Sequence, residues 1–138
     1  MSYKTLEHAT DAIIEVTADN LRDAFRIAGI SVIETILDIS KVNENDSKKI
    51  IVRGKDLRYL LYNWLEEMII LTITEGFAGK RITIEITETD EWEINAEVFG
   101  ENINLDRHDF KVEIKSPTFH DMRIEQDENV VMRYLLDL

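Results

Sequence analysis

Two aspartates near opposite ends of the chain have the residue type and position most suggestive of metal chemistry. Asp11 closes the polar tetrapeptide His8-Ala9-Thr10-Asp11, which separates two short strand-like segments. Asp137 directly follows the apolar run Tyr134-Leu135-Leu136. If that run is an internal strand, Asp137 and the terminal carboxylate of Leu138 are held in place, and Ca²⁺ or Mg²⁺ prefers such oxygen ligands. The alternative is a frayed or hydrogen-bonded chain end.

For the other groups that could carry chemistry, the sequence favours an ordinary structural role. The three histidines, at positions 8, 108 and 120, lack the i, i+4 spacing of a helical metal site, and His120 is expected to be partly buried on a strand. Lys115, near clustered acids, is most simply a surface ion pair. No serine lies in a Gly-x-Ser-x-Gly motif, and Gly76-Phe77-Ala78-Gly79-Lys80 follows a helix and precedes a strand, the wrong order for a phosphate-binding loop. The sequence therefore offers neither a nucleophile nor a nucleotide site.

Composition and charge narrow the function classes further. The 138 residues predict one domain, 1–138, and the 28 acidic against 16 basic side chains give a net charge of −12. That charge disfavours autonomous binding of DNA or RNA and favours basic proteins or metal ions as partners. The absence of cysteine excludes disulfides, thiolate zinc sites and a cysteine nucleophile. No stretch approaches the ~20 apolar residues of a membrane span, so we expect a cytoplasmic protein.

Hydrophobic periodicity predicts the elements that position these residues. Two amphipathic helices are expected, one from Asn20 to about Leu37 and one that Asp56 caps, with the apolar stripe running from Leu57 to Leu71. Alternation and turn residues predict about eight strands, with a hairpin turn at Thr89-Asp90. The expected strands span residues 3–7, 12–18, 49–53, 81–87, 91–99, 110–115, 118–126 and 130–136. The fold class is α+β, a single domain with two long helices packed on antiparallel, sandwich-like β-sheets.

With these elements in place, the whole chain resembles the archease family. The family has a His-Thr-Ala-Asp motif, followed by a helix that opens with Leu-x-x-Ala-Phe. This chain is similar at His8-Ala9-Thr10-Asp11, where the middle two residues are exchanged, and at Leu21-Arg22-Asp23-Ala24-Phe25. Further similarities are the Asp56-Leu57 start of the second helix and the ending Asp137-Leu138. The family's Gly-Glu, downstream His, Lys and Thr are matched at Gly100-Glu101, His108, Lys115 and Thr118. The family's Thr-Asp at the end of the first helix is matched in part by Leu37-Asp38.

The resemblance implies a non-catalytic activator of the RtcB-type RNA-splicing ligase. Such an activator promotes guanylylation of the ligase and multiple turnover in joining 3′-phosphate to 5′-hydroxyl tRNA halves. It also implies that Asp11, Asp137 and the Leu138 main chain bind a divalent cation, Ca²⁺ or Mg²⁺. Among the polar positions, His8, Asp38 and Lys115 are implied to contribute to partner activation.

Two other functions compete with ligase activation. The family has been linked to chaperoning a tRNA methyltransferase, which would use exposed apolar surface rather than a defined site. A metal-dependent hydrolase with Asp11, Asp137 and His8 as ligands would need a general base and a substrate cleft that the sequence does not identify. Any role for one shared ion requires Asp11 and Asp137 to converge, although 126 positions separate them (137 − 11).

Overall fold

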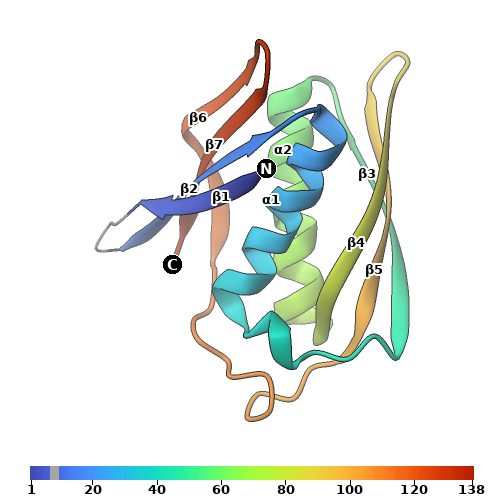
Figure 1. Ribbon diagram of the computed structural model, residues 1–138, viewed down its shortest axis with the longest axis vertical. Coiled ribbons are helices and arrows are strands. Elements are labelled where there is room, and N and C mark those ends of the chain that lie inside the picture. The colour runs from blue at the N-terminus through green and yellow to red at the C-terminus, as the bar shows by residue number, and fades with distance from the viewer. Residues whose placement is uncertain (7–9) are drawn as a thin grey trace.

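The computed structural model describes residues 1–6 and 10–138, and it confirms a single α+β unit. Within that part of the chain, two helices and seven strands form two antiparallel sheets, with orders β1-β2-β7-β6 and β3-β5-β4 (Figure 1). The elements are β1 (Ser2–Leu6), β2 (Asp11–Ala18), α1 (Leu21–Ile36), the 3-10 turn η1 (Ile39–Lys41), β3 (Asp46–Gly54), α2 (Leu57–Ile69), the π-helical segment η2 (Ile70–Thr74), β4 (Phe77–Glu88), β5 (Trp92–Asn102), β6 (Ser116–Gln126) and β7 (Val130–Asp137).

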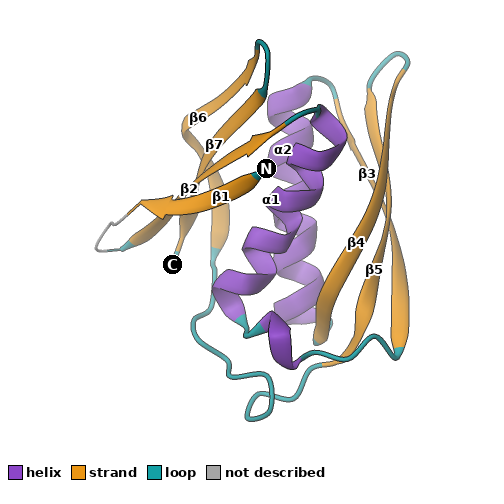
Figure 2. Cartoon of the chain, viewed as in Figure 1, coloured by secondary structure: helices purple, strands orange, loops and turns teal. Residues whose placement is uncertain are grey.

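The two helices form a middle layer between the two sheets (Figure 2). Helix α1 contacts both β4 and β2, and α2 contacts both β3 and β6, so each helix packs against both sheets. The strands bury alternate residues accordingly, and the clearest case is β2, in which Ala12, Ile14, Val16 and Ala18 are buried. No helix among the described residues is long and apolar enough to cross a membrane.

Local sequence signals determine where the helices begin. The Asn20 side chain accepts a hydrogen bond from the Asp23 N–H at 2.8 Å, and the Asp56 side chain accepts one from the Tyr59 N–H at 2.9 Å. Both are N-caps that satisfy an otherwise unpaired helix donor. The expected end of the first helix near residue 37 is confirmed within one residue, because Leu37 is the C-cap.

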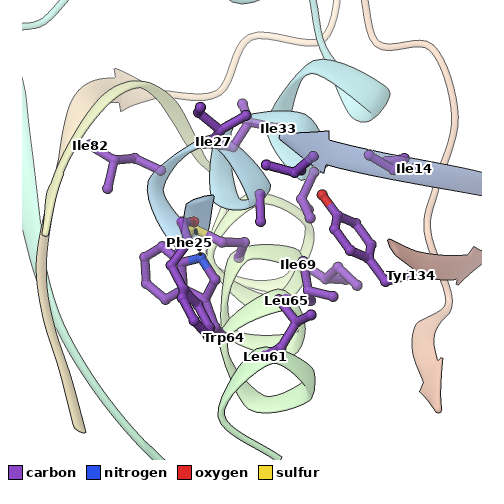
Figure 3. Close-up of a cluster of buried hydrophobic side chains, with 14 of the residues drawn as sticks. Ile14, Phe25, Ile27, Ile33, Leu61, Trp64, Leu65, Ile69, Ile82 and Tyr134 are labelled. Atoms are coloured by element: carbon purple, nitrogen blue, oxygen red, sulfur yellow. Dashed lines mark hydrogen bonds between the residues drawn. The ribbon is translucent and has the colours of Figure 1, made fainter. Parts of the chain in front are cut away.

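The core between the sheets explains why a glycine is tolerated inside α1. A Cβ at Gly29 would lie 2.8 Å from both the Trp64 ring and the Ile82 side chain, so the position requires glycine for close packing. Trp64 is fully buried and donates its indole N–H to the Phe25 carbonyl at 2.8 Å (Figure 3).

A buried polar pair ties β7 to α1. Ser31 Oγ donates to the Ala28 carbonyl at 2.6 Å, which leaves the Tyr134 hydroxyl as donor in the Ser31–Tyr134 hydrogen bond. The side chains of Tyr134 and Ile14 both point toward the helices from the sheet of β2 and β7 (Figure 3). Burial raises the pKa of the Tyr134 phenol and the Ser31 hydrogen bond lowers it. Burial is the larger effect, so the pKa of Tyr134 is raised.

The expected strand at 110–115 is wrong, and the strand count falls from about eight to seven in the described residues. Backbone hydrogen bonds in this segment go to scattered partners instead of one neighbouring strand: the Phe110 N–H to Leu105, the Lys111 N–H to Ile36 and the Lys115 N–H to Asp137. Residues 103–115 therefore form a long connection, "the 103–115 loop", that crosses one end of the helical layer.

Candidate functional site

Strand register brings Asp11 and Asp137 directly opposite each other. The antiparallel pairing of β2 with β7 matches Asp11 with Asp137 and Ala12 with Leu136. Paired Cα atoms in such a ladder lie about 4.5–5.5 Å apart, and their side chains share one face. Because Ala12 and Leu136 are buried toward the helices, the two aspartates project from the opposite face. The expected convergence of the two residues is confirmed.

A serine extends this pair into a row across three strands. Asp137 is also paired with Ser116 of β6, so Asp11, Asp137 and Ser116 occupy adjacent positions on the same face of the sheet. All three residues are partly exposed. We define these residues as "the Asp–Asp–Ser row". Sequence reasoning missed Ser116, whose only signal was its position just before Pro117 at a strand start.

The main chain around Asp137 is fixed on both sides. The Lys115 N–H donates to the Asp137 carbonyl at 2.7 Å, and the Leu138 N–H donates to the Thr10 carbonyl at 3.3 Å. The C-terminal residue is thereby held against the first residues of β2, instead of extending away from the sheet. The chain end is therefore hydrogen-bonded and not frayed, as one form of the alternative expected. Lys115 reaches the row through its backbone while its side chain is exposed.

The donor set fits a hard cation. Two facing carboxylates, a neighbouring hydroxyl and the Leu138 main chain offer oxygen ligands, which Ca²⁺ and Mg²⁺ prefer. Among residues 1–6 and 10–138, no three His, Asp or Glu side chains are grouped closely enough to hold a metal ion by themselves. A cation at the row would therefore need further oxygen donors, such as the Leu138 main chain. His8 lies outside the described residues.

Asp38 lies beside the middle of the 103–115 loop, away from the Asp–Asp–Ser row. It caps η1: its carboxylate accepts from the Ser40 hydroxyl at 2.6 Å and from the Ser40 N–H at 3.1 Å. These hydrogen bonds, with smaller contributions from Lys41 and Lys111, hold the pKa of Asp38 below its usual value. The Asp38 N–H donates to the His108 carbonyl at 2.8 Å, so the 103–115 loop connects the Asp38 region with Asp137.

Glu101 and His108 form the buried anchor of that loop. His108 is fully buried and Glu101 is 7% exposed. The Asn104 N–H donates to His108 Nδ1 at 2.9 Å, so Nε2 carries the proton that is donated to Glu101 at 2.9 Å. Arg107 also contacts the Glu101 carboxylate at 2.9 Å. The burial of His108 emerges only in the assembled fold, because its partner Glu101 belongs to another element.

The Glu101 carboxylate is strongly stabilised in its charged form. The Arg107 hydrogen bond is the largest cause, followed by the Asn43 N–H at 2.9 Å and by His108, and together they lower the pKa of Glu101 to about 2. Asn45 adds a side-chain donor at 3.1 Å. The carboxylate thus ties the 103–115 loop to residues 43–45, and its role is structural.

His120 is not part of the Asp–Asp–Ser row. Its side chain is 75% exposed and lies 3.3 Å from the Asp121 carboxylate. The expected partial burial of His120 is wrong because β6 is irregular between Thr118 and Arg123, where its register with β7 shifts.

Family comparison gives the fold and site a context. Residues 3–138 match the model of the Archease protein family (MTH1598/TM1083), and the chain belongs to that family. It is similar to the archease of Pyrobaculum islandicum, at 31% identity over 100% of this chain and 96% of the relative. It is also similar to the archease of Pyrococcus abyssi, at 33% identity over 87% of this chain and 85% of the relative.

Solved structures share the architecture. The solution structure of protein 1598 of Methanobacterium thermoautotrophicum superimposes with a TM-score of 0.81 at 24% identity, covering 99% of both chains. A crystal structure of an archease from Thermotoga maritima gives a TM-score of 0.63 at 18% identity, covering 98% of this chain and 96% of the other. At these identities the likeness concerns the fold.

Proposed function

We propose that this chain is a non-catalytic protein cofactor of an RtcB-type RNA ligase in the cytoplasm. It would promote guanylylation of the ligase and multiple turnover in joining 3′-phosphate to 5′-hydroxyl tRNA halves. Membership of the archease family supports the proposal. The observation that carries it is the direct pairing of Asp11 with Asp137, which brings two partly exposed carboxylates to one face of the sheet.

The Asp–Asp–Ser row is the proposed point of action. Asp11, Asp137 and the Leu138 main chain would hold Ca²⁺ or Mg²⁺, which supplies positive charge between two otherwise repelling carboxylates. The hydrogen bonds from the Lys115 and Leu138 N–H groups keep the Asp137 backbone in position. In this proposal the side chains of His8, Asp38 and Lys115 contact the ligase.

The net charge favours RNA binding by the ligase and binding of this chain to the ligase. A net charge of −12 repels RNA phosphates, whereas an RNA-binding enzyme carries a basic surface to which this chain can dock. The sequence contains no phosphate-binding glycine loop, so the guanylate chemistry is assigned to the ligase. The proposal therefore treats this chain as a non-enzyme that acts through its partner.

Modulation of a tRNA methyltransferase is a second candidate. Leu105 and Phe110 are 58% and 40% exposed, and a chaperone would use such apolar surface. The ligase proposal has the additional support of the paired aspartates, which chaperoning does not require.

A ligation assay at limiting ligase tests the proposal. With tRNA halves in excess over the ligase, wild-type protein should raise the yield above one product per ligase, and Asp11→Asn should remove that gain. The protein alone, incubated with GTP and RNA, should yield neither joined RNA nor guanylylated chain. Failure to stimulate, or covalent guanylate on this chain, would reject the proposed function.

A further inference from the structure

The 103–115 loop is rigidly held although it has no regular secondary structure. The Glu101–His108 anchor fixes its middle, and main-chain hydrogen bonds of 2.7–2.9 Å fix the rest. These bonds run from Ile103 to Gly76, from His108 to Asn104, from Lys111 to Ile36 and from Lys115 to Asp137. Side chains on this loop are therefore presented in a preorganised arrangement, which reduces the entropy lost on binding.

An apolar groove lies between this loop and the π-helical segment η2. Its volume is about 350 Å³, and it is lined by Thr72, Ile73, Ile103, Leu105, Phe110 and Glu113. Leu105 and Phe110 are among the most exposed large apolar side chains in the described residues. π-helical turns are frequent at functional sites, so both walls of the groove have features associated with binding.

Acidic residues lie at and near the groove. Glu113 lines it, and Glu75 directly follows the η2 segment that forms one of its walls. Glu75 lies close enough to Glu67 that, after burial, its charge is the next cause of the raised pKa of Glu67. Two cations of the loop are engaged, Arg107 by Glu101 at 2.9 Å and Lys111 by the Glu34 carbonyl at 3.0 Å, and the exposed Lys115 lies at the Asp137 end of the loop.

We propose that this groove docks a nonpolar side chain of the ligase that is flanked by lysine or arginine residues. The inference rests on the proposed function and names the docking face that it requires. The Glu113 carboxylate and the net charge of −12 disfavour RNA, because phosphates would be repelled. They also disfavour a second copy of this chain, which would bring the same carboxylate and the same charge.

The groove lies within reach of the Asp–Asp–Ser row. Phe110 and Lys115 are five positions apart in the sequence, so their Cα atoms lie at most about 18 Å apart. The Lys115 N–H is bonded to the Asp137 carbonyl at 2.7 Å. A standard interface buries about 800 Å² on each partner, which is broad enough to cover both the groove and the row.

Two matched variants test the docking face. Leu105→Asp introduces a charge into the groove, and Ile51→Asp introduces the same charge at an equally exposed position, 57% against 58%, on the β3-β5-β4 sheet. Phe110→Ala is a second groove variant that adds no charge. Binding to the purified RtcB-type ligase of the same proteome is measured by calorimetry at 0.15 M salt, together with ligase guanylylation.

Wild type and Ile51→Asp should bind equally, and each groove variant should bind at least about tenfold more weakly. Raising the concentration of Leu105→Asp should restore full guanylylation, whereas Asp137→Asn should not be rescued. If the groove variants bind as wild type does while wild type stimulates, the docking inference is wrong and the proposed function stands. If wild type neither binds nor stimulates the ligase, both fail. Circular dichroism confirms that each variant is folded.

Discussion

Replacing Asp137 by asparagine should change stability in opposite directions without and with a divalent cation. The register places the two carboxylates on facing residues, whose Cβ atoms lie about 5 Å apart. Two like charges at that distance repel by about 0.8 kcal/mol at a dielectric constant of 80 and by about 3 kcal/mol at 20. Because the row is partly exposed, the lower value applies, and Asp137→Asn should stabilise the metal-free protein by about 0.8 kcal/mol.

The sign reverses when the cation is present. At a concentration 100 times its dissociation constant, a ligand that binds only the native state stabilises it by about 2.7 kcal/mol. For 138 residues, at about 2.1 cal/mol/K per residue, the unfolding entropy is about 0.29 kcal/mol/K. Wild type should therefore gain about 9 °C in Tm on adding metal, and Asp137→Asn should gain little; without metal the variant should melt about 3 °C higher.

Differential scanning calorimetry in EDTA, Ca²⁺ and Mg²⁺ measures both shifts. Asp90→Asn, which removes a carboxylate from the exposed β4–β5 turn, is the matched control and should follow wild type in all three conditions. Equal metal-induced shifts in wild type and Asp137→Asn would refute the assignment of the metal to this pair. A less stable Asp137→Asn in EDTA would refute the repulsion argument.

Three further perturbations follow from the core and the loop anchor. The pKa of Glu101 is lowered from an ordinary 4.5 to about 2, so its contribution to the free energy of unfolding is complete above pH 4.5 and is lost as the pH falls toward 2. In Glu101→Gln, the free energy of unfolding measured with urea should therefore vary less with pH in that window. An unchanged pH dependence would contradict this. Tyr134→Phe leaves the buried Ser31 hydroxyl without its donor and should lower the free energy of unfolding, measured by chemical denaturation, by about 1 kcal/mol. An unchanged free energy of unfolding would show that this hydrogen bond contributes nothing. Gly100→Ala would place a Cβ into the Ala78 carbonyl oxygen where β4 and β5 pair, so it should destabilise by more than about 3 kcal/mol, and a Tm within a few degrees of wild type would exclude that packing.

Local chemistry explains which parts of the fold the sequence predicts well. The Asn20 and Asp56 caps act on N–H groups only three residues away, and the β4–β5 hairpin turns between Glu88 and Trp92, so both signals lie within short windows. The segment 110–115 has the apolar spacing of a strand, yet its hydrogen-bond partners are distant in sequence. Only the assembled fold determines where those backbone groups bind.

The candidate site also contains residues that the sequence predicts and residues that only the assembled fold reveals. Resemblance to the archease family predicts that Asp11 and Asp137 share one cation, and the pairing of β2 with β7 places the two residues opposite each other. Ser116 joins them only through the pairing of β6 with β7, which no local pattern reveals. His108 likewise hydrogen-bonds to Glu101, which lies seven positions away and on a different element.

The rate of ligase guanylylation is the most direct test of the central claim that the paired aspartates act on a partner enzyme. Radiolabelled GTP is incubated with limiting RtcB-type ligase and Mg²⁺, with wild-type protein, Asp137→Asn or Asp90→Asn, and label on each chain is followed over time. We expect wild type and Asp90→Asn to accelerate labelling of the ligase, Asp137→Asn not to do so, and this chain to stay unlabelled. Full acceleration by Asp137→Asn, or label on this chain, would contradict it.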